Sequence, residues 1–425
     1  MTARLERPSA LPALNRPPRP PCGLLPPGAG GKRVLRARAN FFNDKETLTA
    51  DPIDPDFVYV TWQRIVAPNE RASARAGERA AAFRSVAWFA RSDDNGASYD
   101  VVKPIFNPGN KAQTIGNQIV VLPNGDLVML FNLIRNVGAN RNRGFTAAVM
   151  RSTDNGDTWS GPIAIDRMIT DGVRDPADGH DVRTGDLIPQ IAVDDDSGDL
   201  YVVWQDDRFT GQEQIAFSRS TNGGGSWSAP ILIDRMITDG VRDPADGHDV
   251  RTGDLIPQIA VDDDSGDLYV VWQDDRFTAQ EQIAFSSSTD GGRSWSATQQ
   301  ISKVGGVNQA FTPTVRVADD GTVAVQHYDF RADDPSSTPP LSTDTWLLRS
   351  ADGGDTWTEE RIGDSSFDMT TAPDAGGYFV GDYAGLDFAG GGARPGLKPF
   401  HVRANSGNLA NRTDVFATTA STSGP

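Results

Sequence analysis

Short runs of β-branched and aromatic residues, separated by turn-forming residues, recur along most of this chain. In one stretch the runs are IPQIAVD, LYVVWQD, QIAFSRS and SAPILID, with Gly, Asp and Ser between them. Runs of this length and composition predict β-strands, and helical periodicity is absent. Tight turns such as LPNGD (residues 122–126), DDDSGD (194–199) and ADDGT (318–322) follow the first run of a unit. We therefore expect neighbouring strands to pair antiparallel.

The strand pattern belongs to a repeating unit that an octapeptide marks. Its five copies start 60, 68, 68 and 62 residues apart, as SDDNGASY (92–99), STDNGDTW (152–159), STNGGGSW (220–227), STDGGRSW (288–295) and SADGGDTW (350–357). Residues 165–210 recur without change as residues 233–278, which indicates a tandem duplication of one unit. Each unit is predicted to be a sheet of four antiparallel strands that cannot bury both faces alone. Such units are typical of β-propeller blades.

A sixth unit follows the five that carry the octapeptide. Its predicted strands lie in GYFVGDYAGLDFA, LKPFHVR and RTDVFATTA, and a fourth strand is missing. Residues 32–39 are expected to supply that outer strand and to fasten the two ends of the ring. The predicted fold class is all-β, a six-bladed β-propeller of four-stranded antiparallel blades, with five or seven blades as alternatives. The propeller is expected over residues 41–420, between a disordered Pro- and Arg-rich segment (1–40) and a short tail (421–425).

The octapeptide is expected to build the fold rather than to catalyse a reaction. Asp154 and Ser152 can hydrogen-bond to the backbone of their own turn. Gly156 supplies a conformation with positive φ, and Trp159 can bury its ring between strands. A catalytic role would require five equivalent active sites, one in each copy.

Composition and charge argue against several partners and cofactors. The 425 residues carry a formal net charge of -17, with a pI near 4.6, whereas a nucleic-acid binder needs clustered Lys and Arg. The single cysteine, Cys22, excludes an internal disulfide and a cysteine zinc site, and the four histidines have no ligand spacing. No run of about 18 apolar residues is present, so no membrane span is predicted. Residues 1–40 lack the apolar core of a signal peptide.

The octapeptides match the signature S-x-D-x-G-x-x-W, and with them the chain resembles the sialidase superfamily of BNR or Asp-box repeat proteins over about residues 43–420. Tyr99 replaces Trp in the first copy, and Asn222 replaces Asp in the third. The segments FFNDKETLTADP, TIGNQIVVLPNG, VVWQDDRF and GDYAGL are similar to bacterial exo-alpha-sialidases. The resemblance implies a glycoside hydrolase, exo-acting on terminal sialic acid or a related acidic sugar. It also implies a glycan or glycoconjugate partner and a secreted or extracellular location, and we expect a monomer.

Arginines end the second strand of every unit, on the face opposite the octapeptides, where the long connections lie. They are Arg64, Arg135, Arg208, Arg276, Arg331 and Arg403. Arginine binds carboxylates through two parallel hydrogen bonds, and sialidases hold the sialic-acid carboxylate with three arginines. By this resemblance Arg208, Arg276 and Arg331 are candidate substrate-binding residues. The alternative is that each pairs with a neighbouring aspartate and ties adjacent blades together.

Polar residues stand where the innermost strands begin, and they include Asp44, Lys45, Glu46, Asn117, Gln118, Gln190, Gln258, Thr314, Asp382 and Tyr383. Sialidases use a tyrosine nucleophile, a glutamate that activates it and an aspartate as acid and base. By resemblance Tyr383 is the nucleophile, Glu46 its base and Asp44 the proton donor, because ring closure brings the sixth and first blades together. Asn117 and Gln118 are further candidates for substrate binding. A structural, hydrogen-bonded Tyr383 is the alternative.

One departure from the family favours a second hypothesis. Sialidases carry F/Y-R-I-P at the first catalytic arginine, whereas this chain has only QRIV (residues 63–66), at the end of a strand. The second hypothesis is a non-catalytic propeller that binds a glycan or a protein.

An acidic loop, TDGVRDPADGHDVRTGD, occupies residues 170–186 and recurs at residues 238–254. Its aspartates Asp171, Asp175, Asp178, Asp181 and Asp186 offer some of the roughly six to eight oxygens that calcium takes. The spacing matches no EF-hand pattern, and a solvated acidic loop is the default expectation. The expected chemistry requires no cofactor, a structural calcium stays open, and no residue is assigned as a metal ligand.

Overall fold

The computed structural model describes the propeller region with several gaps. It describes residues 41–66, 84–99, 101–135, 144–170, 172–173, 179, 187–253, 255–336, 340–390, 395–405 and 412–423. Across these residues the structure consists of β-strands and one short helix, the 3-10 turn η1 (Met369–Thr371). No helix within the described ranges is long and apolar enough to cross a membrane.

Five sheets of four antiparallel strands follow one another along the chain. The first two sheets are β1 (Phe41–Ala50), β2 (Val58–Val66), β3 (Arg84–Ser92) and β4 (Val101–Phe106), then β5 (Ala112–Val121), β6 (Leu127–Arg135), β7 (Phe145–Ser152) and β8 (Ile163–Arg167). The third and fourth are β9 (Gln190–Val193), β10 (Leu200–Asp206), β11 (Gln214–Ser220) and β12 (Ile231–Arg235), then β15 (Gln258–Val261), β16 (Leu268–Asp274), β17 (Gln282–Ser288) and β18 (Gln299–Gln300). The fifth is β19 (Ala310–Val317), β20 (Val323–Asp329), β21 (Ser342–Ser350) and β22 (Thr358–Asp368).

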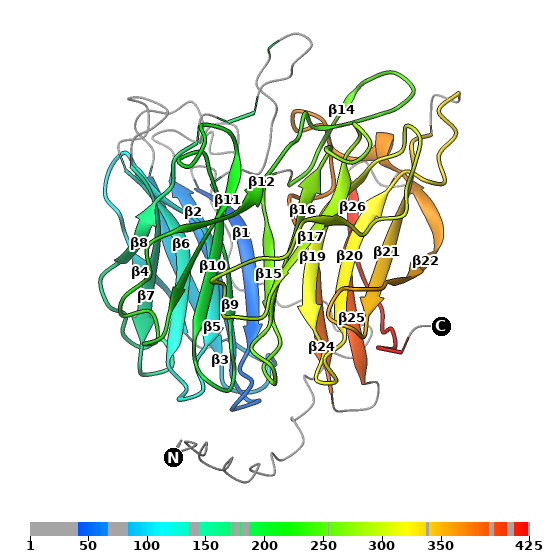
Figure 1. The fold of residues 1–425 in the computed structure, drawn as a ribbon. Coiled ribbons are helices and arrows are strands. Elements are labelled where there is room, and N and C mark those ends of the chain that lie inside the picture. The colour runs from blue at the N-terminus through cyan, green and yellow to red at the C-terminus, as the bar shows by residue number, and fades with distance from the viewer. Residues whose placement is uncertain are drawn as a thin grey trace, which may run out of the picture.

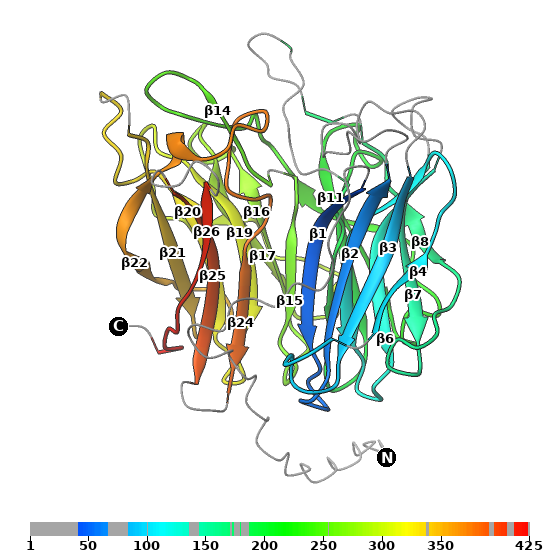
Figure 2. The same ribbon diagram turned by 180° about the vertical axis from the view of Figure 1, so that it is seen from behind.

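Two further sheets have three strands each among the described residues. The sixth in chain order is β24 (Gly385–Ala389), β25 (Gly396–Ala404) and β26 (Thr413–Ala417). A small seventh sheet joins β13 (Val241–Arg242), β14 (Asp249–Arg251) and β23 (Tyr378–Phe379), and β14 pairs with β23 in parallel. Figures 1 and 2 show the six large sheets side by side round the molecule, with the seventh at the upper end near β14. These sheets are consistent with the blades of a propeller.

The hydrophobic core is divided among the spaces between successive sheets. Every residue of β10, β16 and β20 is buried, because these second strands are covered on both faces. A separate apolar cluster lies between each pair of consecutive sheets, from the first and second to the fifth and sixth. The fully buried members of these clusters include Phe131, Trp204, Trp272, Phe285 and Leu397. This burial explains why the first five residues of LYVVWQD (200–206) are apolar without alternation.

The octapeptides form the turns between the third and fourth strands, as expected from their sequence. In the second copy, the Gly156 amide donates to Ser152 Oγ at 2.8 Å, and the Thr158 amide donates to Asp154 Oδ1 at 2.8 Å. Gly156 has φ of 84°, and its missing Cβ leaves room for the ring of Phe89 in the first sheet. This turn therefore closes on itself and also contacts the preceding sheet.

One expectation about the sixth unit was wrong. Residues 377–389 do not form one strand, because Tyr378–Phe379 pairs with β14 and β24 begins only at Gly385. In the second acidic loop, Val241 and Val250 are buried in an apolar cluster with Val380, whereas Asp246 and Asp249 are exposed. The aspartates of the first acidic loop and the closing strand expected over residues 32–39 lie outside the described residues.

Candidate functional site

The inner strands of three sheets are bulged near their upper ends, which lie opposite the octapeptides. The antiparallel register shifts between Asp44 and Thr47 in β1, and equivalent shifts occur in β5 and β19. Lys45 and Thr312, within two of these bulges, have φ of 54° and 52°. Such a conformation costs free energy in a residue with a side chain, and it is common at functional sites. The bulge in β1 turns the segment Asp44–Thr47 away from the regular ladder.

Tyr383 lies beside this bulge, just before β24. The Lys45 ammonium is 5.2 Å from the centre of the Tyr383 ring and 2.7 Å from Asp382 Oδ2. Arg251 donates from Nε to Asp382 Oδ1 and from Nη2 to Oδ2, each at 3.1 Å. The side chain of Asp382 is only 5% exposed. A buried carboxylate with two cationic partners therefore stands next to Tyr383 and joins the sixth sheet to the first.

The electrostatic surroundings of Tyr383 include the other predicted catalytic residues. Burial raises the pKa of Tyr383 above its usual range, and the charges of Asp44, Asp382 and Glu46 raise it further. Asp44 accepts a hydrogen bond from Gln63 at 3.1 Å, whereas Glu46 is exposed. The charges of Asp44 and Glu46 therefore contribute to the electrostatic surroundings of Tyr383.

Asp382 is held as a carboxylate. Burial by itself raises the pKa of Asp382, but the charges of Lys45 and Arg251 and their hydrogen bonds outweigh burial and lower it below its usual range. Ionised Asp382 is paired on both oxygens, so its own orientation is fixed.

Two of the predicted substrate-binding arginines connect neighbouring sheets. Arg208 Nε donates to Asp206 Oδ1 at 2.8 Å, and its Nη1 donates to Asp166 of β8, in the preceding sheet, at 2.9 Å. Arg276 repeats this arrangement 68 residues later, with Asp274 in its own sheet and Asp234 of β12 in the preceding one. These contacts correspond to the alternative in which arginines tie adjacent blades together.

Arg331, the third arginine, is occupied within its own sheet. Its Nε donates to Asp329 at 2.7 Å and its Nη1 to Glu359 at 3.0 Å. The guanidinium also stacks on Trp346, 3.7 Å from the ring centre. All three guanidinium groups therefore bind carboxylates of the protein itself.

The remaining predicted binding residues are also engaged or buried. Gln118 donates to the carbonyl oxygen of Pro189 at 2.9 Å and so links the second sheet to the third. Asn117 is fully buried, and its backbone carbonyl accepts a hydrogen bond from Thr47 at 2.9 Å.

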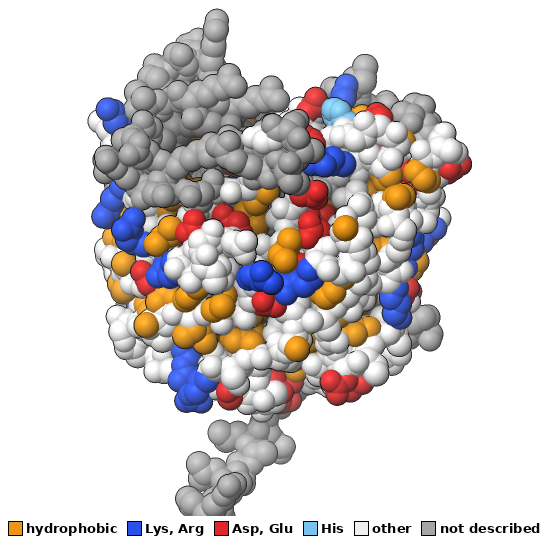
Figure 3. Space-filling model, turned by 45° about the horizontal axis from the view of Figure 1, so that its top comes forward, with side chains coloured by type: hydrophobic (Ala, Val, Ile, Leu, Met, Phe, Trp, Pro, Cys, Tyr) orange, Lys and Arg blue, Asp and Glu red, His pale blue; other side chains and the backbone are white. Residues whose placement is uncertain are grey.

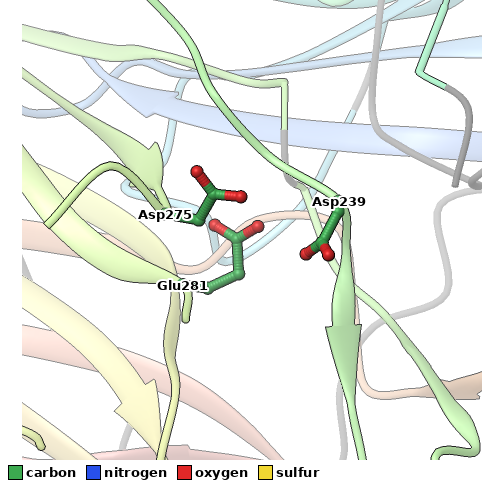
Figure 4. Close-up of side chains that lie close together, drawn as sticks. All are labelled: Asp239, Asp275 and Glu281. Carbon is green, nitrogen blue, oxygen red and sulfur yellow. The ribbon is translucent and has the colours of Figure 1, made fainter. Parts of the chain in front are cut away.

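A group of three carboxylates lies near the second acidic loop (Figure 4). Asp239, Asp275 and Glu281 each place an oxygen within 4.8 Å of the others. Burial and then the charges of Asp239 and Asp274 raise the pKa of Asp275 to about 6. These are the described residues that could hold a cation. Calcium takes about six to eight oxygens, so three carboxylates would supply only part of its coordination.

Acidic and basic side chains are interspersed over the described part of the upper face (Figure 3), and apolar side chains lie between them. The chain carries 57 acidic and 40 basic residues, and this view shows both signs without an extended basic field among the described residues.

Arg251 was missed by sequence reasoning. It belongs to the duplicated block, where Arg183 stands in an identical local sequence. No signal in the sequence distinguishes the arginine that reaches Asp382 from its copy.

Comparison with known proteins identifies the fold. No family model matches the chain, and no curated protein matches it by sequence. A solved structure from Dyadobacter fermentans, described as a protein of unknown function, has a TM-score of 0.50 at 14% identity and covers 91% of this chain and 97% of its own. A Hadza microbial sialidase has a TM-score of 0.50 at 15% identity, with 89% of this chain and 65% of that chain covered. A leech intramolecular trans-sialidase has a TM-score of 0.50 at 12% identity, with 92% and 70% covered.

These similarities define a sialidase-like β-propeller fold. At such low identity they concern the fold alone. The chain spans about two thirds of the length of the microbial sialidase that it resembles.

Proposed function

We propose that this protein is a sialidase-like glycoside hydrolase that removes a terminal sialic acid or a related acidic sugar from a glycan. The observation that carries the proposal is the position of Tyr383 beside the bulge of β1 that contains Asp44 and Glu46. The Lys45 ammonium, between these two residues in the chain, lies 5.2 Å from the centre of the Tyr383 ring, and the charges of Asp44 and Glu46 raise the pKa of Tyr383. These residues come from the last and first large sheets and lie at the end opposite the octapeptides.

In the proposed reaction, Tyr383 is the nucleophile. Its hydroxyl oxygen bonds to the anomeric carbon while the bond from that carbon to the leaving oxygen breaks. Glu46 takes the phenolic proton, and Asp44 gives a proton to the leaving oxygen. Water then attacks the anomeric carbon and gives a proton to Asp44, while the bond from that carbon to the Tyr383 oxygen breaks and the oxygen takes its proton back from Glu46. Because the pKa of Tyr383 is raised, its hydroxyl is protonated at neutral pH and needs such a base.

The proposal includes a six-bladed ring. Five interfaces join the six large sheets in chain order, and the Lys45–Asp382 ion pair connects the first strand with the last sheet. Residues 32–39 are proposed as the fourth strand of the sixth sheet. In support, β26 ends that sheet with Val415 74% exposed.

A second candidate function is a propeller that binds a glycan or a protein without catalysis. Arg208, Arg276 and Arg331 already bind carboxylates of the protein, which favours this candidate because the acid group of a sugar would have to displace them.

The direct test is release of a fluorophore from an activated sialoside by the purified protein, with Tyr383→Phe as control. We expect turnover by the natural protein and a loss of at least about a thousandfold in the variant, since one hydroxyl carries the covalent step. Equal rates in both proteins would reject the hydrolase. Binding of the sialoside without turnover, measured by calorimetry, would instead support the second candidate.

A further inference from the structure

The second copy of the acidic loop contacts the segment that precedes β24, the first strand of the sixth sheet. This loop leads into β15, yet its strand β14 pairs with β23, so that Val250 stands opposite Tyr378 and Arg251 opposite Phe379. The ring of His248 lies 4.2 Å from that of Tyr378. Backbone pairing and ring contact therefore attach the loop to the segment that carries Tyr383.

Arg251 fixes the position of Asp382 within this attachment. Its Nε and Nη2 donors, which together form a two-pronged fork, reach the two carboxylate oxygens at 3.1 Å each. Its guanidinium lies 4.0 Å from the centre of the Phe379 ring. A two-point contact sets the rotation as well as the distance of a carboxylate. Lys45 binds the same carboxylate at 2.7 Å while its ammonium lies over the Tyr383 ring. Asp382 is thus oriented by two cations from two different sheets.

Gly253 allows the backbones to meet at this point. A Cβ on Gly253 would lie 2.0 Å from the carbonyl oxygen of Asp382, which is far inside van der Waals contact. The loop therefore touches the peptide unit between Asp382 and Tyr383 directly, and a larger residue would push them apart.

Only one of the two copies can make these contacts. Residues 165–210 and 233–278 are identical, so Arg183 and Gly185 correspond to Arg251 and Gly253. Neither Asp382 nor β23 has a duplicated counterpart. Arg251 already binds Asp382, and β14 already pairs with β23. The place of each copy in the ring, and not its sequence, determines which one reaches Tyr383.

We infer that Arg251 is a positioning residue that orients Tyr383 through Asp382, and that its copy Arg183 has no such role. The catalytic part of this inference rests on the proposed function of Tyr383, whereas the geometric part does not. Loss of the fork frees Asp382 to turn, and the phenol oxygen then no longer meets the substrate at a fixed distance. Misplacement of a reacting group by about 1 Å can cost roughly a hundredfold in rate.

The test compares Arg251→Gln with Arg183→Gln, a matched pair in identical local sequence. Tyr383 is replaced by 3-fluorotyrosine in the full chain, and its ¹⁹F resonance is recorded for each variant. We expect Arg251→Gln to shift or broaden the resonance and Arg183→Gln to leave it unchanged. With a fluorogenic sialoside, Arg251→Gln should lower kcat by roughly ten- to a hundredfold with little change in KM, and Arg183→Gln should not.

Further variants test the same inference if Arg251→Gln does not fold. Arg251→Lys retains the charge but loses the fork, and Gly253→Ala can be compared with Gly185→Ala. Equal resonances for the two members of each pair would overturn the inference. If the natural protein hydrolyses no sialoside, the proposed function fails, but the ¹⁹F comparison still decides whether Arg251 positions Tyr383.

Discussion

Asp154 shows how a single side chain stabilises the octapeptide turn. Its carboxylate accepts hydrogen bonds from the hydroxyl and the amide of Thr158 and from the hydroxyl of Ser152. These bonds, those from Thr158 first, lower the pKa of Asp154 from 3.8 to about 2. Asp352 in the fifth copy has a pKa lowered to about 2 for the same reason, with Thr356 as its main donor. The third copy has Asn222 at this position, so one turn lacks the titrating group.

Replacing Asp154 by Asn should therefore change how stability depends on pH. Because the pKa of the folded state lies below the ordinary 3.8, the ionised carboxylate stabilises the fold above about pH 4, and this contribution is lost as pH falls through about 2. Urea unfolding should show the largest difference between Asp154→Asn and the natural protein above pH 4 and a smaller one near pH 2. Asn222→Asp should introduce the same pH dependence. A difference that is constant from pH 6 to pH 2 would contradict this explanation.

Single residues of the candidate site were only partly predictable. Ring closure suggested that Tyr383 meets Asp44 and Glu46, and Lys45, which lies between these two residues in the chain, has its ammonium 5.2 Å from the centre of the Tyr383 ring. Arg251 could not be predicted, because identical sequence surrounds Arg183. A contact that depends on position in the ring leaves no local signature.

Among the elements, the strands were largely predictable because their residues must fit a sheet buried on both faces. The runs IPQIAVD, LYVVWQD and QIAFSRS contain β9, β10 and β11. The small sheet of β13, β14 and β23 was not predicted. Its strands are two or three residues long and come from distant parts of the chain, so neither periodicity nor a hairpin turn reveals them.

The octapeptide glycine can be tested as part of the contact between sheets. A Cβ on Gly156 would lie 2.3 Å from Cζ of Phe89, and φ is +84°. Gly125 has φ of +85° with nothing within 4 Å of its Cβ position. Gly125→Ala should cost about 1 kcal/mol for the backbone conformation alone, and Gly156→Ala should cost about 2–4 kcal/mol because it also displaces the ring. Equal losses in chemical denaturation would show that Phe89 moves freely.

At the scale of the whole molecule, arginines and apolar clusters join the sheets into one body. Arg276 connects Asp274, which is fully buried, with Asp234 of the preceding sheet. The duplicated unit repeats this connection through Arg208. The sequence predicted the repeat and the position of these arginines, but it left open whether they bind substrate or the protein. Whether an arginine can reach a carboxylate of the preceding sheet depends on the distance between the two sheets. That distance is set only in the assembled fold.

Arg276→Leu should destabilise the protein by about 3–5 kcal/mol, because it removes the guanidinium that balances the buried charge of Asp274. Arg293→Leu is the control, since Arg293 is exposed and its guanidinium donates to the carbonyl of Asp290 in its own turn, and it should change stability by less than about 0.5 kcal/mol. Urea denaturation measures both. If Arg276→Leu keeps its stability but loses sialoside binding, the guanidinium serves the substrate and not the sheets.

The central claim is that Tyr383 forms a covalent bond with the sugar. It is tested most directly by incubating the protein with an activated 3-fluorosialosyl fluoride, whose intermediate hydrolyses slowly, and mapping the modified peptide by mass spectrometry. We predict one glycosyl group on the peptide that contains Tyr383 and none in Tyr383→Phe. An adduct on another residue, or turnover of sialosides with no adduct on Tyr383, would contradict the account.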